Sequence, residues 1–157
     1  MTPLIQQNRK EERETKRMKQ QYDMPCNIAQ TLNIIGDKWT LLIINQIMKG
    51  KDTFTKISDG LEKIPSNLLS SRLKSLEKDK IIEVELYQKH PPRYRYTLTN
   101  SGKDLSIVLH SLIMWGEKHL DECHKSLIHK ECNHKVELQH YCCHCNKLVD
   151  GKNVIIK

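Results

Sequence analysis

Residues 66–99, SNLLSSRLKSLEKDKIIEVELYQKHPPRYRYTLT, decide the fold of this chain. Their first half spaces leucines as one face of a helix does, behind Ser66, which can cap a helix that runs to about Asp79. Their second half alternates polar and apolar residues on both sides of Pro91 and Pro92, as hairpin strands do. Because proline cannot donate a ladder hydrogen bond, the pair predicts a stiff hairpin tip. For this segment alone, an ordinary solvated hairpin is an equally simple interpretation.

Helical periodicity recurs on both sides of this stretch. After it, a long helix is predicted from Asn100 or Ser101 to about Cys123. Before it, three helices are predicted at residues 26–35, 38–48 and 53–61, with Gly36 and Gly50 ending the first two. Four helices, a hairpin and a long helix, in this order, are typical of a winged helix-turn-helix. We therefore predict a mainly α fold with a small β-hairpin wing, in the α+β class.

Length and composition favour a cytoplasmic protein with one main domain. The chain has 157 residues, enough for one domain with a core of its own. No apolar run exceeds four residues, whereas a membrane span needs about 20. The charged amino terminus also lacks the apolar centre of a secretory signal. We expect a basic arm at residues 1–22, flexible or helical, a main domain at 23–124 and a small tail at 125–157.

The charge of the chain favours a polyanionic partner. The formal net charge is +7 and the isoelectric point is near 9.1, and a basic surface attracts phosphate groups. The helix after Ser66 is polar opposite its leucines, which suits the base edges and phosphates of DNA, although a solvated helix surface is the alternative. Arg72 falls nearer to the leucines and is expected to be structural, with a paired head group. The candidate DNA contacts are Asn67, Ser70, Ser71, Lys74 and Lys78 on the helix and Lys89, Arg93 and Arg95 on the hairpin.

Three motifs stand out between residues 26 and 116. They are IGDKWT at 35–40, LLSSRLKSLEKDKII at 68–82 and PPRYRYTLTNSGKDL at 91–105. With the cysteine that opens the first helix, they make this part of the chain resemble the HxlR family of bacterial transcriptional regulators, a branch of the MarR-like winged-helix proteins. The resemblance implies a homodimer on a pseudo-palindromic operator of double-stranded DNA, with the helix after residue 66 in the major groove and the wing beside it. The chain departs from the family pattern at Asn27, where proline is common.

The predicted long helix carries a broad apolar stripe. The stripe is wider than a small DNA-binding domain needs for its own core. In addition, a monomer on a single half-site would make few DNA contacts. We therefore expect this stripe, together with the first helix, to form the interface of a homodimer. The residues of the stripe are Leu105, Val108, Leu109, Leu112 and Trp115.

Cys26 is a candidate redox sensor. A cysteine at the start of a helix lies at the positive end of the helix dipole, which can lower the pKa of the thiol and favour the reactive thiolate. Some members of the resembled family sense quinones, aldehydes or oxidants at this position, so the resemblance implies a small electrophile or oxidant as effector. The alternative is a cysteine that serves as a small buried apolar residue.

The tail is rich in cysteine and histidine. His129 and Cys132 are separated by two residues, as are Cys142 and Cys145, and this spacing is typical of the knuckles of a structural zinc ribbon. We therefore predict a zinc site with these four ligands, which would fold a tail too small for a core of its own. Unliganded thiols and a thioredoxin-like redox motif are the alternatives. Other donors could substitute for members of the set, namely Cys123, His124, His134 and Cys143.

The sequence leaves three classes of function to compare. A sequence-specific DNA regulator accounts for the helix pattern, the wing and the charge together. A thiol-based redox protein would use the tail cysteines, and a protein-binding winged-helix module would share the fold without binding DNA. Since the chain has no glycine-rich cofactor loop, no α/β alternation and no Ser/His/Asp constellation, we expect no enzymatic activity.

Overall fold

The computed structural model describes residues 21–62, 64–122 and 124–157, so nearly all of the predicted basic arm lies outside the described residues. The chain divides into two compact units, Met1–Thr99 and Asn100–Lys157. The boundary between the units therefore falls before the predicted long helix. None of the helices in the described ranges is long and apolar enough to cross a membrane.

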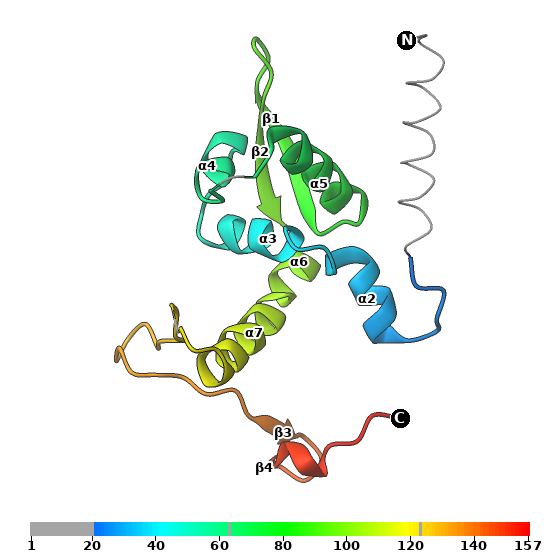
Figure 1. Ribbon diagram of the computed structural model, residues 1–157, viewed down its shortest axis with the longest axis vertical. Helices are drawn as coiled ribbons and strands as arrows, with labels where there is room; N and C mark the ends of the chain where they lie inside the picture. Colours follow the sequence, from blue (N-terminus) through cyan, green and yellow to red (C-terminus); the bar gives the residue numbers. More distant parts are fainter. Residues whose placement is uncertain (1–20, 63, 123) are drawn as a thin grey trace. The chain divides into compact units, whose positions relative to one another are not determined.

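The first unit is a winged helix-turn-helix. Its helices are α2 (Asn27–Ile35), α3 (Thr40–Met48), α4 (Phe54–Asp59) and α5 (Ser66–Lys78), and its strands are β1 (Ile82–Gln88) and β2 (Arg93–Leu98). The strands form an antiparallel hairpin, the wing, which projects beyond helices α4 and α5 (Figure 1). The predicted fold class is thus confirmed, since four helices precede one hairpin as the sequence indicates.

An apolar core fixes the helices that carry the wing. The leucine stripe of α5 is buried at Leu69, Leu73 and Leu76, as its spacing predicts. Helix α3 lies at the centre of the unit, and its Ile43 and Ile44 have no exposed surface. Burying one such side chain stabilises the folded state by about 1.5–3 kcal/mol. The core therefore sets which face of α5 is left for the solvent.

Two helices begin elsewhere than the sequence predicts. Helix α3 starts at Thr40, not at residue 38, because the carboxylate of Asp37 accepts hydrogen bonds from the Trp39 N–H, at 2.9 Å, and from the Thr40 hydroxyl. Helix α5 has Pro65 as its N-cap, with extended dihedral angles of −63° and 136°. The prediction that Ser66 caps this helix is therefore wrong. Ser66 is its first residue, and the extended Pro65 leads the chain into the helix.

Gly36 ends helix α2, as predicted, but steric contact and not a left-handed turn requires glycine there. Its φ angle is −75°, which any residue can adopt. The Gly36 N–H donates to the Leu32 carbonyl at 2.8 Å, and a Cβ atom at position 36 would collide with that same carbonyl oxygen. Gly50, after α3, has a φ angle of 80°, where glycine is favoured.

The wing is fastened to the segment that precedes α4. Its two strands pair with one irregularity, between Leu86 and Gln88. The Tyr96 N–H of β2 donates to the carbonyl of Asp52 at 2.8 Å. This bond extends the two-stranded hairpin by a short third segment, so the base of the wing and the start of α4 are held together.

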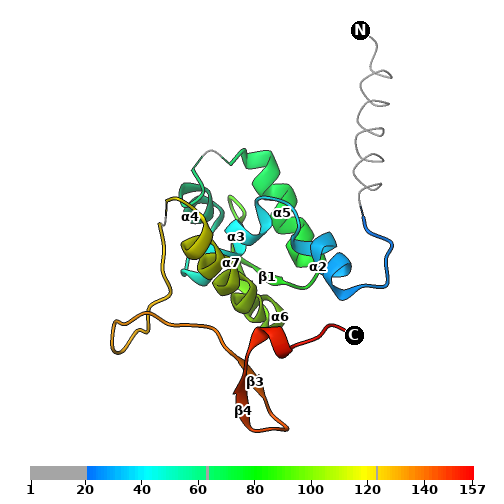
Figure 2. The ribbon, with the colours of Figure 1, turned by 60° about the horizontal axis from the view of Figure 1, so that its bottom comes forward.

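The second unit holds two helices and a small hairpin. Its elements are α6 (Asn100–Asp104), α7 (Ser106–His119), β3 (His140–Cys142), β4 (Lys147–Val149) and the short 3-10 helix η1 (Gly151–Asn153) (Figure 2). The prediction of one continuous helix to Cys123 is wrong. The helix is interrupted at Leu105, just after a glycine and an aspartate that form helices poorly, and it ends at His119 because Leu120 is extended.

Candidate nucleic-acid interface

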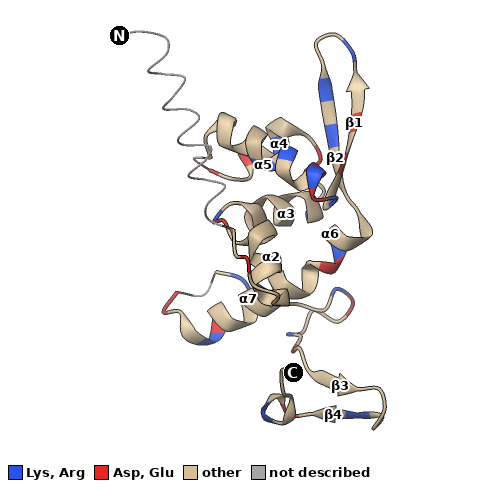
Figure 3. Cartoon of the chain, turned by 90° about the vertical axis from the view of Figure 1, so that its right-hand side faces the viewer, with Lys and Arg blue, Asp and Glu red and all other residues tan. Residues whose placement is uncertain are grey.

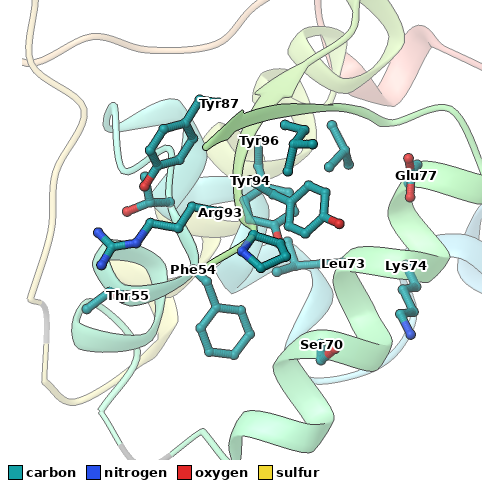
Figure 4. Close-up of a pocket in the computed structure, with 14 residues that line it drawn as sticks. Phe54, Thr55, Ser70, Leu73, Lys74, Glu77, Tyr87, Arg93, Tyr94 and Tyr96 are labelled. Atoms are coloured by element: carbon teal, nitrogen blue, oxygen red, sulfur yellow. The ribbon is translucent and has the colours of Figure 1, made fainter. Parts of the chain in front are cut away.

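A groove of about 1060 Å³ lies between helix α5 and the wing. Helix α5 lines it with Ser70 and Lys74, the start of α4 with Phe54 and Thr55, and the wing with Arg93. Figure 4 shows Ser70 and Lys74 on the α5 side and Arg93 on the wing side, with Phe54 between them. The groove thus presents hydroxyl groups and cations from three segments on one face of the unit.

The candidate DNA contacts on α5 divide into two groups. Ser70 and Lys74 line the groove, whereas Asn67, Ser71 and Lys78 do not. The Asn67 side-chain oxygen accepts a hydrogen bond from the next residue's N–H at 2.9 Å, and Ser71 is half-buried. The sequence places Ser70 only at the edge of the polar face of α5. Ser70 nevertheless lines the groove, because the wing forms the opposite side of the groove at that edge.

Arg72 is a structural residue, as predicted. Its Nε lies 3.3 Å from Oδ1 of Asp37, an ion pair without the alignment of a hydrogen bond, and both side chains are about a quarter exposed. Asp37 is the same residue that organises the start of α3. The pair therefore ties the middle of α5 to the turn between α2 and α3, and it fixes the rotation of α5 about its axis.

Arg95 is held at the base of the wing. Its Nε lies 3.1 Å from Oδ2 of Asp52, and its guanidinium carbon stands 5.3 Å from the centre of the Tyr87 ring. Lys56 reaches Oδ1 of the same aspartate at 2.8 Å. The hydrogen bond from Lys56, supported by the charges of Lys56 and Arg95, holds the pKa of Asp52 below its ordinary value. Arg95 was predicted as a DNA contact, and the structure places it in this anchor.

Four predicted cations remain for an anionic partner. Within the part of the chain that the structure describes, no ion pair is formed by Lys74, Lys78, Lys89 or Arg93. All four are exposed, and Lys89 lies in the turn between the wing strands. Lysine and arginine residues mark strand β2 and the wing tip (Figure 3). Such cations can neutralise phosphates without first breaking an internal pair.

The tyrosines of the wing are part of the groove that the sequence reading missed. Tyr94 and Tyr96 both line it, opposite Leu86 and Val84 on β1. Burial, followed by the charges of Tyr94 and Glu77, raises the pKa of Tyr96. The signal was available, because alternate residues of a strand share a face and YRY therefore separates its tyrosines from Arg95.

Cys26 occupies the N-cap position of the nine-residue helix α2, as predicted. Its dihedral angles are extended, its side chain makes no capping hydrogen bond, and it is half-buried. Its N–H donates to the Met24 carbonyl at 2.8 Å, and its carbonyl accepts from Gln30 at 2.9 Å. The thiol thus lies at the positive end of a helix, in a position that small reagents can reach.

The four predicted metal ligands form two pairs. Nδ1 of His129 lies 3.0 Å from Sγ of Cys132, and the Cys145 N–H donates to Sγ of Cys142 at 3.5 Å. That N–H is the main cause that lowers the pKa of Cys142. In the described ranges no group of three or more His, Cys, Asp or Glu side chains is arranged to hold a metal ion. Cys123, an alternative ligand, lies outside these ranges.

Residues 34–124 match the family described as HxlR-like helix-turn-helix. The HTH-type transcriptional regulator Rv3095 of Mycobacterium tuberculosis is 30% identical over 131 residues, which cover 82% of this chain and 82% of the relative. The match spans more than the winged unit alone.

Two solved structures of transcriptional regulators resemble part of the chain. The reduced form of the transcriptional regulator YodB from B. subtilis is 29% identical with a TM-score of 0.53, and the match covers 62% of this chain and 97% of YodB. The redox regulator HypR, in its oxidised form, is 33% identical with a TM-score of 0.54 and covers 62% of this chain and 100% of HypR.

Proposed function

Because the chain belongs to the HxlR-like helix-turn-helix family of transcriptional regulators, which are not enzymes, we propose that it acts as a homodimer on a pseudo-palindromic DNA operator. Helix α5 enters the major groove, and the wing follows the neighbouring phosphates. The observation that carries this proposal is the groove, which is lined by Ser70 and Lys74 of α5 and by Arg93 of the wing. A regulator of this kind works beside the bacterial chromosome, in the cytoplasm.

The contacts divide by their chemistry. Ser70 and the polar residues Asn67 and Ser71 are short donors and acceptors on α5, suited to base edges. Lys74, Lys78, Lys89 and Arg93 are cations that suit phosphates, and phosphate contacts set the register of the protein on the duplex. Arg95 acts indirectly, because its bond to Asp52 holds the wing in place.

Exposed apolar side chains support the homodimer. On α7, Ile107, Leu112 and Trp115 are 65%, 52% and 59% exposed, and on α2, Ile28 is 60% exposed. Large apolar residues at this density on two helices favour an interface. Leu109, which was predicted to lie in that interface, is buried within the chain, so Ile107 takes its place in the proposed surface.

Control by oxidants or electrophiles acts through Cys26 in this proposal. HypR is a redox regulator and YodB was solved in its reduced form, and both share the fold that places Cys26 at the start of α2. Modification of the thiol would add bulk or charge at the end of a helix whose apolar face belongs to the proposed dimer interface.

A salt series on immobilised DNA tests the proposal. The binding constant of the full chain, measured on its operator and on scrambled DNA, should fall steeply with salt, because cations release condensed counterions from the duplex. Lys74→Ala should weaken binding and make the salt dependence shallower. If the chain binds neither the operator nor the scrambled DNA, or if its affinity does not change with salt, it would instead be a winged-helix module that binds protein partners.

A further inference from the structure

Two hairpin tips in the second unit have the same construction. The first tip, residues 129–134, is closed by the His129 N–H, which donates to the His134 carbonyl at 2.8 Å. The second tip, residues 142–147, is closed by the pairing of Cys142 with Lys147 at the end of strands β3 and β4. Each tip therefore has one closing pair and four residues between its members.

Nitrogen and sulfur donors stand at the same places in both tips. The first position is His129 in one tip and Cys142 in the other, and the fourth position is Cys132 in one and Cys145 in the other. An asparagine follows each fourth position, Asn133 with a φ angle of 57° and Asn146 with a φ angle of 53°. Asparagine adopts this left-handed conformation more easily than most residues do, so both tips turn the chain sharply just after the second donor.

The donors of each tip face one another. Nδ1 of His129 and Sγ of Cys132 are 3.0 Å apart, and the Cys145 N–H points at Sγ of Cys142. Two donors separated by two residues, on a backbone that bends back between them, form the chelating half of a tetrahedral metal site. Each tip supplies one such half.

We propose that one Zn²⁺ ion joins the two tips through His129, Cys132, Cys142 and Cys145. Four ligands of nitrogen and thiolate sulfur are the set that structural zinc prefers, and thiolates select zinc over magnesium or calcium. Each cysteine binds as its thiolate and gives its proton to the solvent, so binding grows tighter as pH rises. The site goes beyond the DNA-binding function and does not depend on it.

The order of the chain allows the tips to meet. The first hairpin returns at Val136, whose N–H donates to the Leu127 carbonyl at 2.9 Å, and the second hairpin begins at His140. The three residues 137–139 between them belong to no helix or strand. Zinc binding would require a bend within these residues that brings the second hairpin beside the first, with both tips at the same end.

The tail needs such a centre. No residue from 124 to 157 is buried, so these residues lack an apolar core of their own. A structural zinc ion supplies the folding free energy that a core would otherwise provide, and small ribbons depend on it. Glu117 of α7 already accepts hydrogen bonds from Ser126 and Lys135 at the base of the first hairpin, so this hairpin is in place to receive the second.

The matching positions also select among the other donors. Cys143 and His144 occupy the middle of the second tip, where the first tip has Lys130 and Glu131. His134 lies at the closing position, where the second tip has Lys147. None of these donors has a counterpart of the same kind, so the set shared by both tips excludes them. This exclusion gives matched control variants within each tip.

The test is metal analysis of the full chain, purified without a polyhistidine tag or chelator. We expect about one zinc per chain by mass spectrometry of the metals. Cys145→Ser and His129→Ala should each lower the zinc content at least tenfold after dialysis against a weak chelator. Cys143→Ser and His134→Ala, the controls in the same two tips, should keep it.

Cobalt substitution gives a second measurement that does not depend on the folding of any variant. Co²⁺ bound to the parent chain should show the visible absorption of a tetrahedral site with sulfur-to-metal charge-transfer bands, and Zn²⁺ should displace it. A parent chain that takes up neither metal, or binds Co²⁺ with an octahedral spectrum, overturns the proposal. Equal loss of zinc in Cys143→Ser or His134→Ala overturns the assigned ligand set.

Discussion

Arg95 and Asp52 form an ion pair at 3.1 Å that joins strand β2 to the residue just before the α4 N-cap. Arg93, two residues earlier on the same strand, has no ion-pair partner within the described ranges and lines the groove. The two arginines of the RYR segment therefore have separate tasks. Arg95 positions the wing, and Arg93 lines the groove that we propose binds DNA.

Replacing Arg93 should weaken binding to all DNA sequences alike. In Arg93→Ala the lost cation no longer neutralises a phosphate, so the slope of affinity against salt should become shallower by about one unit for each half-site. The measurement is a salt series on operator and scrambled DNA. If neither affinity nor slope changes, the wing does not touch DNA. Arg95→Ala serves as the comparison, because it should also lower the unfolding temperature of the first unit, which Arg93→Ala should leave unchanged.

Replacing Ser70 should relax sequence discrimination. Its hydroxyl lies in the groove on α5, so Ser70→Ala should reduce the difference in binding free energy between operator and scrambled DNA by roughly 1–3 kcal/mol if the base contact is direct. Ser75→Ala is the control, because the Ser75 hydroxyl donates to the Ser71 carbonyl at 3.2 Å within the helix. Equal behaviour of the two variants in a competition assay would contradict the assignment.

A charged residue on the exposed face of α7 should separate the homodimer. Leu112→Glu and Trp115→Glu would place carboxylates in the proposed apolar interface, where an unpaired charge is costly. Sedimentation at micromolar concentration should show a dimer for the parent and a monomer for both variants, which should also lose operator affinity. Lys118→Glu adds the same charge to the same helix outside the apolar stripe, and it should remain dimeric. A monomeric parent would count against the interface.

Oxidation should release the operator through Cys26. Diamide or a quinone should weaken operator binding by the parent, since these reagents modify thiols at accessible positions. Cys26→Ser should keep the untreated affinity and lose the response. Cys143→Ser controls for the exposed thiols of the tail. A Cys26→Ser variant that responds like the parent would place the sensor elsewhere or remove it.

The stability of the first unit should depend on Asp52 in acid. The Lys56 hydrogen bond holds the pKa of Asp52 below its ordinary value of 3.8 in the folded protein. The ionised carboxylate therefore stabilises the fold above pH 3.8, and this contribution disappears as the pH falls through the lowered folded-state value. Asp52→Asn should unfold at a lower temperature than the parent at neutral pH, and the difference should narrow in acid. The control is Glu117→Gln, which removes a carboxyl of lowered pKa from the second unit. This variant should not alter how the unfolding temperature of the first unit depends on pH.

The sequence predicted the winged unit because its signals are local. Leucines at helical spacing, alternation in EVEL and YRYTL, and the proline pair each depend on neighbours within a few residues, and the buried Leu69 and Leu76 confirm the resulting core. Arg72 was placed correctly for the same reason, since the helical period alone puts it near the leucines.

The groove was predicted only in part because it depends on distant residues. Phe54 and Thr55 reach it from α4, and Asp52 pairs with Arg95 at the base of the wing. Neither of these contacts shows in any local pattern of the sequence. The interruption at Leu105 was missed because apolar periodicity continues across it. An apolar stripe predicts which face of a helix is buried, but it does not predict where the helix is interrupted.

Gly36 also bears on how much variation the chain can tolerate. The position is exposed, and exposed positions normally accept most side chains at little cost to stability. Here any Cβ atom would press on the Leu32 carbonyl, and the collision is with backbone, which cannot swing aside. The surface of this protein therefore contains a site as restrictive as its core, and solvent exposure alone would misjudge the range of sequences that fold this way.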